Sequence, residues 1–444
     1  MTKKLRLGIA GLGTVGVGLV NLLDARHEHL LRITGKSIVI QAVSARYKSK
    51  NRGIDISSIK WFDDPIALAR NDEIDIFIEL IGGDEGVARD SIMAALKSGK
   101  HVITANKALI AKHGNEMAAL AEERNVALLF EASVAGGIPI INALREILLG
   151  NSINRIYGIL NGTCNYILTK MQEERLPFWE VLKQAQDFGY AESDPTFDIG
   201  GHDTAHKLAI LSSLAFGTEV TSNKIHIEGI QSITPEDIEA ADALGYKIKL
   251  LGIAVKTKSG LEQRVHPTMI SKNSSIAEVS GVTNCVAIDS EFAGNLTFVG
   301  PGAGADATAS AVMSDIGNVA RGFFSAPFLM PSRSLISDSK TKSSQHLSSY
   351  YVRLAIHDRP GAMAAIATRM AEQNVSLESI VQRRPQYQSP GKISTINSEE
   401  NSHAYAVLVT YETSEKAMRD AMEAIEEDGV IAHPPQIIKI EHLH

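Results

Sequence analysis

Hydrophobic and polar positions follow two alternating patterns over residues 1–131. Short apolar runs alternate with segments in which apolar residues recur every three to four positions, the period of a helix. The strand-like runs are residues 5–10, 37–44, 74–80, 101–104 and 126–130. Alternating strands and helices are typical of a parallel sheet with helices on both faces. The pattern therefore predicts an α/β fold with a Rossmann-type, doubly wound domain over residues 1–137.

The pattern changes at Ile138. Pro139 suits the first turn of a helix, and the apolar positions after it are spaced to form one stripe of that helix. These positions are Ile140, Ile141, Leu144, Ile147 and Leu148. Strand and helix signals are then mixed, which predicts an α+β domain over residues 138–331. Residues 305–331 are a candidate for packing back on the first domain.

A polar stretch precedes a third pattern. Residues 332–348 are rich in Ser and Lys and poor in apolar residues, which is typical of a linker. Residues 349–444 then follow the order β-α-β-β-α-β, which predicts a small ferredoxin-like module. Because the linker is long and polar, we expect the module to be separable, so that a chain ending near Ser348 stays folded.

Composition narrows the classes of function. The chain has 44 Lys and Arg against 51 Asp and Glu, a net charge of −7, and no basic block. That balance argues against a nucleic-acid or membrane partner. The two cysteines, Cys164 and Cys285, are too few for a disulfide framework, and no apolar run reaches the roughly 18–20 residues that span a bilayer. We expect a cytoplasmic protein with a small-molecule substrate.

A glycine-rich turn follows the first predicted strand and opens a helix. Gly11 would make the tight turn, Gly13 would let a pyrophosphate approach the backbone, and Gly16 would pack the helix on the strand. Thr14 and Val15 begin that helix, whose N-terminus would face the anion. The turn predicts dinucleotide binding; the alternative is a purely structural turn.

The end of the second predicted strand bears on the choice of cofactor. An NAD site places a carboxylate there, but this strand ends at Arg46 and is followed by Lys48, Lys50 and Arg52, with no acid before Asp55. Such a basic cluster suits a 2′-phosphate. We predict a preference for NADP(H), with NAD(H) also possible; the alternative is that these are solvated loop charges.

The most specific segment runs from Gly189 to Lys207. Asp203 and Lys207 are four residues apart, so a helix would place both on one face, and the preceding loop supplies three more acids. These acids are Glu192, Asp194 and Asp198. A lysine beside acids and an apolar run can carry a tuned pKa and shuttle a proton. The spacing alone fits an ordinary surface ion pair equally well.

This segment closely resembles the signature of the homoserine dehydrogenase family. The segments that agree with the family elsewhere are 11–16, 105–107, 131–138, 161–166 and 300–306, and residues 349–444 resemble an ACT domain, the regulatory module often fused to it. The resemblance covers nearly the whole chain. It implies reversible reduction of L-aspartate 4-semialdehyde to L-homoserine with NAD(P)H, on the route to threonine, methionine and isoleucine.

The resemblance also implies residue roles. Lys207 would be the general acid and base, and Asp203 would orient it and position the substrate. Glu192, Asp198 and Thr163 would contact the substrate. The further cofactor contacts would be Thr104, Gly302, Gly304 and Lys107, the last lying also beside the substrate.

The loop 131–138 resembles the family's monovalent-cation loop. Glu131 would give a carboxylate oxygen, and Val134, Gly136 and Ile138 would give carbonyl oxygens. Gly136 and Gly137 would let the backbone curl around the ion. Oxygen ligands suit Na⁺ rather than a transition metal. The alternative is a plain strand-to-helix loop.

Two other functions compete. A semialdehyde dehydrogenase needs an activated cysteine, but Cys164 has no base beside it in sequence, stands where the family often has threonine, and is predicted to be a small packed residue. His202 and His206 are expected to be solvated or hydrogen-bonded rather than metal ligands. The second competitor is an amino-acid-responsive nucleotide-binding regulatory protein without catalysis.

The ACT resemblance implies an effector and an assembly. L-Threonine, an end product of the pathway, would bind near the turn Asp358–Gly361, and the chain would form a homodimer or homotetramer.

Overall fold

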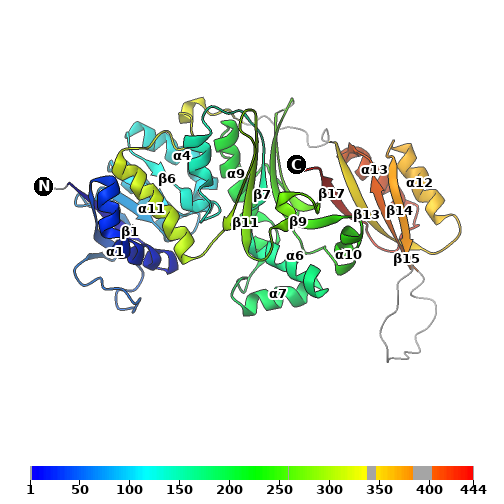
Figure 1. Cartoon of the computed structure of the whole chain (residues 1–444), viewed down its shortest axis with the longest axis horizontal. Helices are drawn as coiled ribbons and strands as arrows, with labels where there is room; N and C mark the ends of the chain where they lie inside the picture. The colour runs from blue at the N-terminus through cyan, green and yellow to red at the C-terminus, as the bar shows by residue number, and fades with distance from the viewer. Residues whose placement is uncertain (1–2, 259, 338–346, 384–402, 444) are drawn as a thin grey trace.

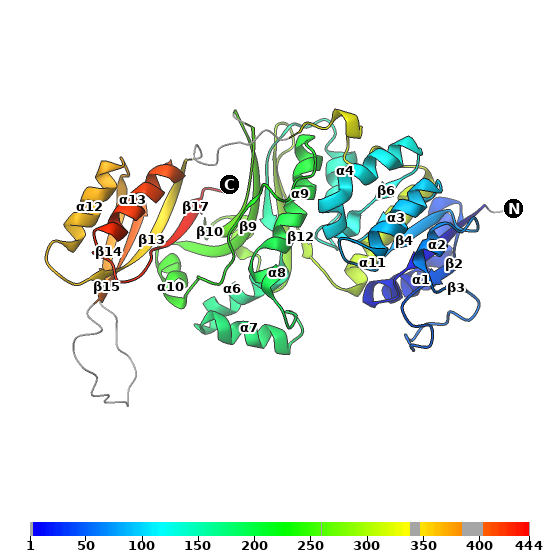
Figure 2. The same cartoon turned by 180° about the vertical axis from the view of Figure 1, so that it is seen from behind.

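The computed structural model describes residues 3–258, 260–337, 347–383 and 403–443. Three parts follow one another along the long axis: a parallel α/β part with the N-terminus, a central part, and a C-terminal module (Figures 1 and 2). Within the described residues, no helix combines the length and the apolar character needed to cross a bilayer.

The first part is the predicted doubly wound sheet. All its strands are parallel, in the order β3-β2-β1-β4-β5-β6. The strands are β1 (Lys4–Ala10), β2 (Ser37–Ser44), β3 (Lys60–Phe62), β4 (Ile76–Glu79), β5 (His101–Thr104) and β6 (Leu128–Leu129). The helices are α1 (Thr14–Thr34), α2 (Pro65–Ala69), α3 (Val87–Lys97) and α4 (Lys107–Glu123). Because the strand order reverses between β1 and β4, the carboxyl ends of these two strands form the usual ligand-binding edge of such a fold.

A helix from much later in the chain completes this part. The helix α11 (Ala305–Arg321) lies against α1 (Figure 1). Its buried residues Val312 and Ile316 belong to the same apolar cluster as Leu19 and Leu23 of α1. Residues 305–321 therefore return to the N-terminal Rossmann part after the chain has built the central one.

The central part and the C-terminal module share one 11-stranded sheet. The main path is β12-β11-β7-β9-β10-β17-β13-β15-β14, with β8 beside β10 and β16 beside β13. The strands are β7 (Ile153–Ile159), β8 (His226–Ile227), β9 (Tyr246–Thr257), β10 (Gly260–Ser271), β11 (Thr283–Ser290), β12 (Gly294–Pro301), β13 (Leu347–His357), β14 (Leu377–Arg383), β15 (His403–Thr410), β16 (Thr413–Ser414) and β17 (Gln436–Glu441).

Helices pack on this sheet. The central ones are α5 (Ile140–Asn142), α6 (Gly162–Glu174), α7 (Phe178–Asp187), α8 (Thr196–Ile199), α9 (His202–Phe216) and α10 (Pro235–Ala243), with short turns η1 (Glu131–Ser133), η2 (Ala143–Ile147), η3 (Ser275–Glu278) and η4 (Ser332–Ser334). The module adds α12 (Ala362–Glu372) and α13 (Glu415–Glu427), which confirms its β-α-β-β-α-β order. α9 lies on β7, β9 and β10 and also touches α4, so it connects the central sheet with the Rossmann part.

The C-terminal module is joined to the central part through the sheet as well as through residues 332–348. β17 pairs with β13 of the module on one side and, in parallel, with residues 268–270 of β10 on the other. Arg264 of β10 and Glu441 of β17 form a buried ion pair at 2.5 Å. A local sequence pattern does not encode pairing between strands that lie far apart in the chain, and this pairing argues against the predicted separability of the module.

The expected linker is also more ordered at its start than its composition indicates. Ser332 opens η4, and its backbone N–H and hydroxyl donate to the Glu122 carboxylate of α4. Ile336 exchanges backbone hydrogen bonds with Gly217 and Glu219. Residues 338–346 lie outside the described residues, and residues 347–348 already belong to β13.

The helix predicted after Pro139 is short and changes type. α5 gives way at Ala143 to the π-helical turn η2. The wider turn removes Ile147 from the predicted apolar stripe, and its side chain is 76% exposed. Ile140, Ile141, Leu144 and Leu148 are buried as expected.

Candidate active site

The glycine turn fits a dinucleotide. Gly11 has φ +105°, and a Cβ there would collide with the Leu80 carbonyl; a Cβ on Gly16 would collide with the Gly11 carbonyl. Gly13 has no neighbour in the direction of a Cβ, and Gly13 and Thr14 are exposed, with Val15 half-buried. No side chain caps the first turn of α1, so its backbone N–H groups are available to an anion.

A second glycine turn stands beside the first. Gly304 has φ +114° at the start of α11, and a Cβ on Gly18 of α1 would lie 3.2 Å from the Ala305 carbonyl. Gly302 leaves room for the buried Asn284 side chain, into which a Cβ would project. The structure therefore brings Gly302 and Gly304 to the N-terminal end of α1.

The predicted basic cluster divides into two groups. Arg46 and Lys48 are exposed just beyond the end of β2. Arg52 instead turns back onto the protein, donating to the Leu12 carbonyl at 3.2 Å and the Tyr47 carbonyl at 2.6 Å. Only the exposed members remain candidates for a cofactor phosphate.

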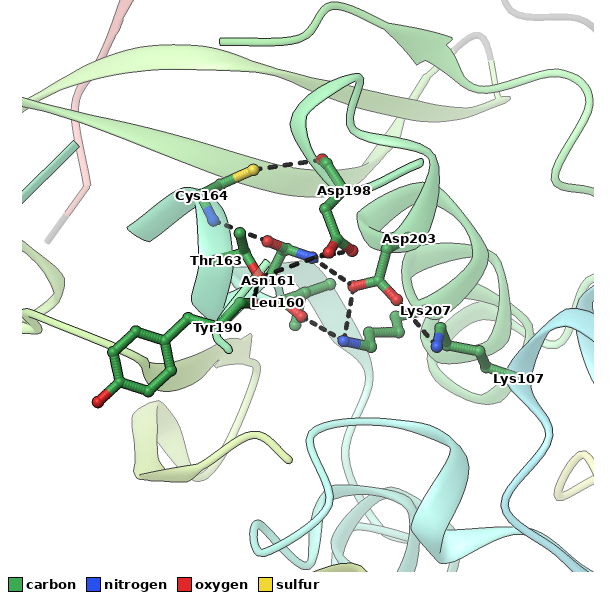
Figure 3. Close-up of polar contacts among 9 residues, drawn as sticks. All are labelled: Lys107, Leu160, Asn161, Thr163, Cys164, Tyr190, Asp198, Asp203 and Lys207. Carbon is green, nitrogen blue, oxygen red and sulfur yellow. Dashed lines mark hydrogen bonds and ion pairs between the residues drawn. The ribbon is translucent and has the colours of Figure 1, made fainter. Parts of the chain in front are cut away.

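The Asp–Lys pair lies on α9 as predicted. This helix begins after Gly201, which has φ +85°, and its first two turns place Asp203 and Lys207 on one face. Lys207 Nζ donates to Asp203 Oδ2 at 2.8 Å and to the Leu160 carbonyl at 2.6 Å (Figure 3). Asp203 is 3% exposed and Lys207 9%, so this is a buried pair and not the surface alternative.

A second lysine approaches from the Rossmann part. Lys107 opens α4, and its Nζ lies 3.1 Å from Asp203 Oδ1 (Figure 3). One carboxylate therefore holds two ammonium groups, one from each side. Burial alone would raise the Asp203 pKa, but the charges of Lys207 and Lys107 outweigh it and hold the pKa well below its usual value.

The start of α6 closes the site. Asn161 caps this helix through the Cys164 backbone N–H, and its side-chain amide donates to Asp198 and Asp203, both at 2.9 Å. Thr163 donates to the Tyr190 carbonyl at 2.8 Å and lies 3.4 Å from Asp198. Burial and the nearby charge of Asp203 raise the Asp198 pKa. The structure therefore joins Thr163, Asp198, Asp203, Lys207 and Lys107.

The other acids of the loop are not part of this contact network. Glu192 is exposed, and its backbone carbonyl accepts a hydrogen bond from the Gln186 side chain. Asp194 accepts from the Thr196 backbone N–H and is likewise exposed. The sequence pattern grouped them with Asp198 because they are near in sequence, but their side chains face solvent.

Cys164, His202 and His206 lie in three different environments beside the Asp–Lys pair. The Cys164 thiol is fully buried, donates to the Asp198 carbonyl, and has a pKa raised by burial. His202 is exposed, whereas burial lowers the pKa of the half-buried His206. In the described parts of the chain, no group of three or more His, Cys, Asp or Glu side chains could hold a metal ion.

The loop 131–138 differs from expectation in its geometry. Gly136 and Gly137 are not at positive φ; Ala135 is, at +51°. The two glycines instead allow the loop to pack closely on residues 301 and 302. A Cβ on Gly136 would lie 3.1 Å from the Gly302 carbonyl oxygen, and a Cβ on Gly137 would lie 2.8 Å from the Pro301 ring. Val134 and Ile138 are buried on either side.

The Glu131 carboxylate is committed to backbone groups. Its two oxygens accept from the Ile141 and Asn142 N–H groups at 3.0 and 2.7 Å, while its own N–H donates to Asp315. Burial and the neighbouring carboxylate raise the Glu131 pKa to about 8, and burial raises the Asp315 pKa to about 7.

Two site residues were missed by sequence reasoning. Asn161 is the first residue of the segment 161–166, and the pattern it shows in the sequence is that of an N-cap before a helix. Glu79 is a charged residue that ends an apolar strand, and it is fully buried. Its Oε2 accepts a hydrogen bond from the Thr104 hydroxyl at 2.6 Å. Thr104 is thus brought to the site edge, but its hydroxyl is engaged by that carboxylate.

A dinucleotide-binding sheet with a buried Asp–Lys pair and a second lysine at its junction defines an NAD(P)-dependent oxidoreductase. Family models agree with this class: homoserine dehydrogenase matches residues 139–316, the homoserine dehydrogenase NAD-binding domain residues 11–131, and the ACT domain residues 350–429. Homoserine dehydrogenase of Neisseria gonorrhoeae is 41% identical over 448 residues, covering 100% of each chain.

Solved structures agree as well. A homoserine dehydrogenase from Thiobacillus denitrificans has a TM-score of 0.91 at 39% identity, covering 100% of this chain and 99% of that one. A hyperthermophilic archaeal homoserine dehydrogenase in complex with NADPH has a TM-score of 0.62 at 28% identity, covering 73% and 99%. The chain belongs to the homoserine dehydrogenase family, with a C-terminal ACT domain. It interconverts L-homoserine and L-aspartate 4-semialdehyde with NAD(P); neither competing function is favoured.

Proposed function

We propose that Lys207 is the proton donor for reduction of the semialdehyde. The observation that supports this is the fixed position of the Lys207 ammonium group. Two of its N–H groups donate to the Leu160 carbonyl and the Asp203 carboxylate, and within the described residues the third N–H has no protein acceptor. A bound nicotinamide would supply the hydride for the carbonyl carbon. The Lys207 ammonium gives its free proton to the carbonyl oxygen, and neutral Lys207 takes the proton back from the hydroxyl in the reverse direction.

Asp203 and Lys107 support that proton transfer. Because Asp203 stays ionised, it keeps Lys207 oriented through the hydrogen bond between them. Lys107 donates to the other oxygen of the same carboxylate and lies half-exposed, so it is available to cofactor and substrate as well.

The substrate ammonium would be held by carboxylates. Asp198 is half-buried beside Thr163 and has a raised pKa, which a bound ammonium would lower again. Glu192 is retained as a second anionic contact; it is exposed and would have to turn inward on binding.

NADP(H) is the proposed preferred cofactor, with NAD(H) as an alternative. Exposed Arg46 and Lys48 directly follow β2, at the position where a 2′-phosphate would lie in this fold. The nucleotide would rest on Gly11, Gly13 and Gly16 at the α1 N-terminus.

Na⁺ is the proposed structural cation of the loop 131–138. Among the described residues, no backbone hydrogen bond reaches the Val134 and Gly136 carbonyls, which leaves them to a cation. The Ile138 carbonyl already accepts from Ile140, and the Glu131 carboxylate would have to share its oxygens with two N–H groups. The cation would fix the loop against the second glycine turn. Titrating activity with NaCl against choline chloride tests the need for it.

Regulation, assembly and compartment complete the proposal. L-Threonine binds the ACT domain near Asp358–Gly361, where Gly361 opens α12 at φ +90°.

The strand β12 lies at the end of the sheet path, and a homodimer or homotetramer forms by covering such an edge. The two buried free thiols favour the cytoplasm.

The test compares Lys207→Met with Lys107→Met, using Lys170→Met as the control, a half-exposed lysine on α6 whose ion pairs are with Glu173 and Glu174 of the same helix. We expect Lys207→Met to lower kcat by about 10²–10⁴ while NADPH still binds. Lys107→Met should raise the KM for the semialdehyde more than it lowers kcat, and Lys170→Met should change neither. A larger loss of kcat in Lys107→Met than in Lys207→Met would reassign the donor.

A further inference from the structure

Glu79 is a fully buried carboxylate at the end of β4. It stands in register with Ala10, the last residue of β1, and with Thr104, the last residue of β5. Its Oε1 accepts the Ile81 and Gly82 backbone N–H groups at 2.7 and 2.9 Å, and its Oε2 accepts the Thr104 hydroxyl at 2.6 Å. In the described part of the chain it forms no ion pair, so neutral donors alone satisfy it.

On one side, Glu79 shapes the loop that touches the glycine turn. The Leu80 N–H donates to the Ala10 carbonyl at 2.7 Å, and Gly11 packs so closely on Leu80 that it has no room for a side chain. The two N–H groups held by Glu79 turn the chain directly after this contact. The loop 80–83 is therefore fixed against the first glycine of the nucleotide turn.

On the other side, Glu79 shapes the start of α4. The Thr104 hydroxyl that donates to Glu79 also accepts the Asn106 N–H at 2.9 Å. Asn106 then caps α4 and donates its side-chain amide to the Gly83 carbonyl at 2.6 Å. The hydrogen bonds thus form a closed ring, from Glu79 through Thr104 and Asn106 back to the loop that Glu79 holds.

Lys107 comes directly after this ring. It is the first residue of α4, and its ammonium reaches Asp203, the carboxylate that also orients Lys207. The ring therefore sets the position of two parts of the site. One is the loop 80–83, at the carboxyl ends of β1 and β4, where the reactive end of a dinucleotide binds in this fold. The other is Lys107, which connects through Asp203 to the proton donor Lys207.

We infer that Glu79 is a positioning residue for hydride transfer. Its carboxylate fixes the distance between the cofactor-side loop 80–83 and the Lys107–Asp203–Lys207 chain without touching the substrate. A carboxylate suits this role because it only accepts, and all its protein partners here are donors. An amide in its place keeps the shape but directs an N–H₂ group at one of those donors.

The test uses the full-length chain with Glu79→Gln and a matched control, Glu122→Gln. Glu122 lies at the far end of α4, and its carboxylate also accepts backbone N–H and hydroxyl donors, from Ser332. Glu79→Gln should lower kcat about 10–100-fold, since a misplacement of about 1 Å can cost about 10²-fold, while the KM for the semialdehyde changes less than about threefold. Glu122→Gln should keep the wild-type kcat.

A kinetic isotope effect separates positioning from mere loss of structure. With NADPH deuterated at the transferred position, the isotope effect on kcat should rise in Glu79→Gln and stay at the wild-type value in Glu122→Gln. If Glu79→Gln does not fold, Asn106→Ser decides, because serine can still cap α4 but cannot reach Gly83. It should lower kcat and raise the isotope effect in the same way. Wild-type kcat and isotope effect in the folded variants would overturn the inference.

Discussion

Replacing Arg353 by methionine tests whether the ACT domain and the catalytic body unfold as one unit. Arg353 of β13 donates to both oxygens of Asp237, at 2.6 and 3.1 Å, and Asp237 belongs to α10 of the body. Asp237 is fully buried. The variant removes the cation and leaves the carboxylate in place.

The magnitude follows from what remains around Asp237. Breaking a buried ion pair costs about 3–5 kcal/mol. Asp237 keeps three neutral donors, the Thr234 N–H and hydroxyl and the Tyr351 hydroxyl, so we expect the lower end, about 3 kcal/mol. In the double variant Arg353→Met/Asp237→Asn no charge is left unpaired, and we expect about 1–3 kcal/mol of the loss to be recovered.

Tryptophan fluorescence can report on the catalytic body separately from the ACT domain. Its two tryptophans, Trp61 and Trp179, both lie outside the ACT domain. Urea unfolding followed by tryptophan fluorescence therefore reports on the body alone, and circular dichroism reports on the whole chain. Arg353→Met should shift both transitions together, whereas Arg369→Met, which breaks half-exposed ion pairs with Asp428 and Glu372 within the ACT domain, should shift them much less. A fluorescence transition that stays in place while circular dichroism moves would refute the shared unit.

Three further outcomes are expected. A chain ending at Ser348 should be unstable and inactive because β10 loses its neighbour β17; recovery of a folded truncated enzyme with wild-type kcat would contradict this. Arg46→Ala should raise the KM for NADPH about tenfold or more and leave that for NADH within about twofold, since a charge-assisted hydrogen bond to the phosphate contributes about 1.5–3 kcal/mol; equal effects would exclude phosphate recognition. Because the pKa values of Glu131 and Asp315 are raised, the folded state holds protons that the unfolded chain releases near pH 4, and the free energy of unfolding should fall as the pH rises toward about 8. Urea titrations at pH 6 and pH 9, at fixed Na⁺, should show a smaller fall in Asp315→Asn than in the wild type. An equal fall in both would show that the pair does not titrate in this range.

Local patterns predicted the parts of the site that are contiguous in sequence. The glycine turn and the Asp203–Lys207 spacing each lie within one turn or helix, so their geometry follows from the chain itself. Residues 131–138 show the limit of such reasoning, because their glycines serve contacts with residues 301 and 302 and not the curvature of the loop.

Long-range pairing could not be predicted in the same way. The parallel contact of β17 with β10 and the buried Glu79 ring depend on which strands become neighbours. Asn161 gave only the signal of a helix cap, and its second role, joining Asp198 to Asp203, appears when α6 and α9 come together. Neighbouring acids such as Glu192 and Asp194 were grouped by sequence although their side chains face solvent.

The most direct test of the proposed chemistry is the single-turnover rate of NADPH oxidation by Lys207→Met at saturating L-aspartate 4-semialdehyde. The variant is loaded with NADPH first, and its affinity is measured by cofactor fluorescence, so that binding and chemistry are separated. If Lys207 gives the proton, the rate falls by about 10²–10⁴ while the Kd for NADPH stays within about threefold of wild type. A single-turnover rate within about threefold of wild type would contradict the assignment of Lys207 as the proton donor.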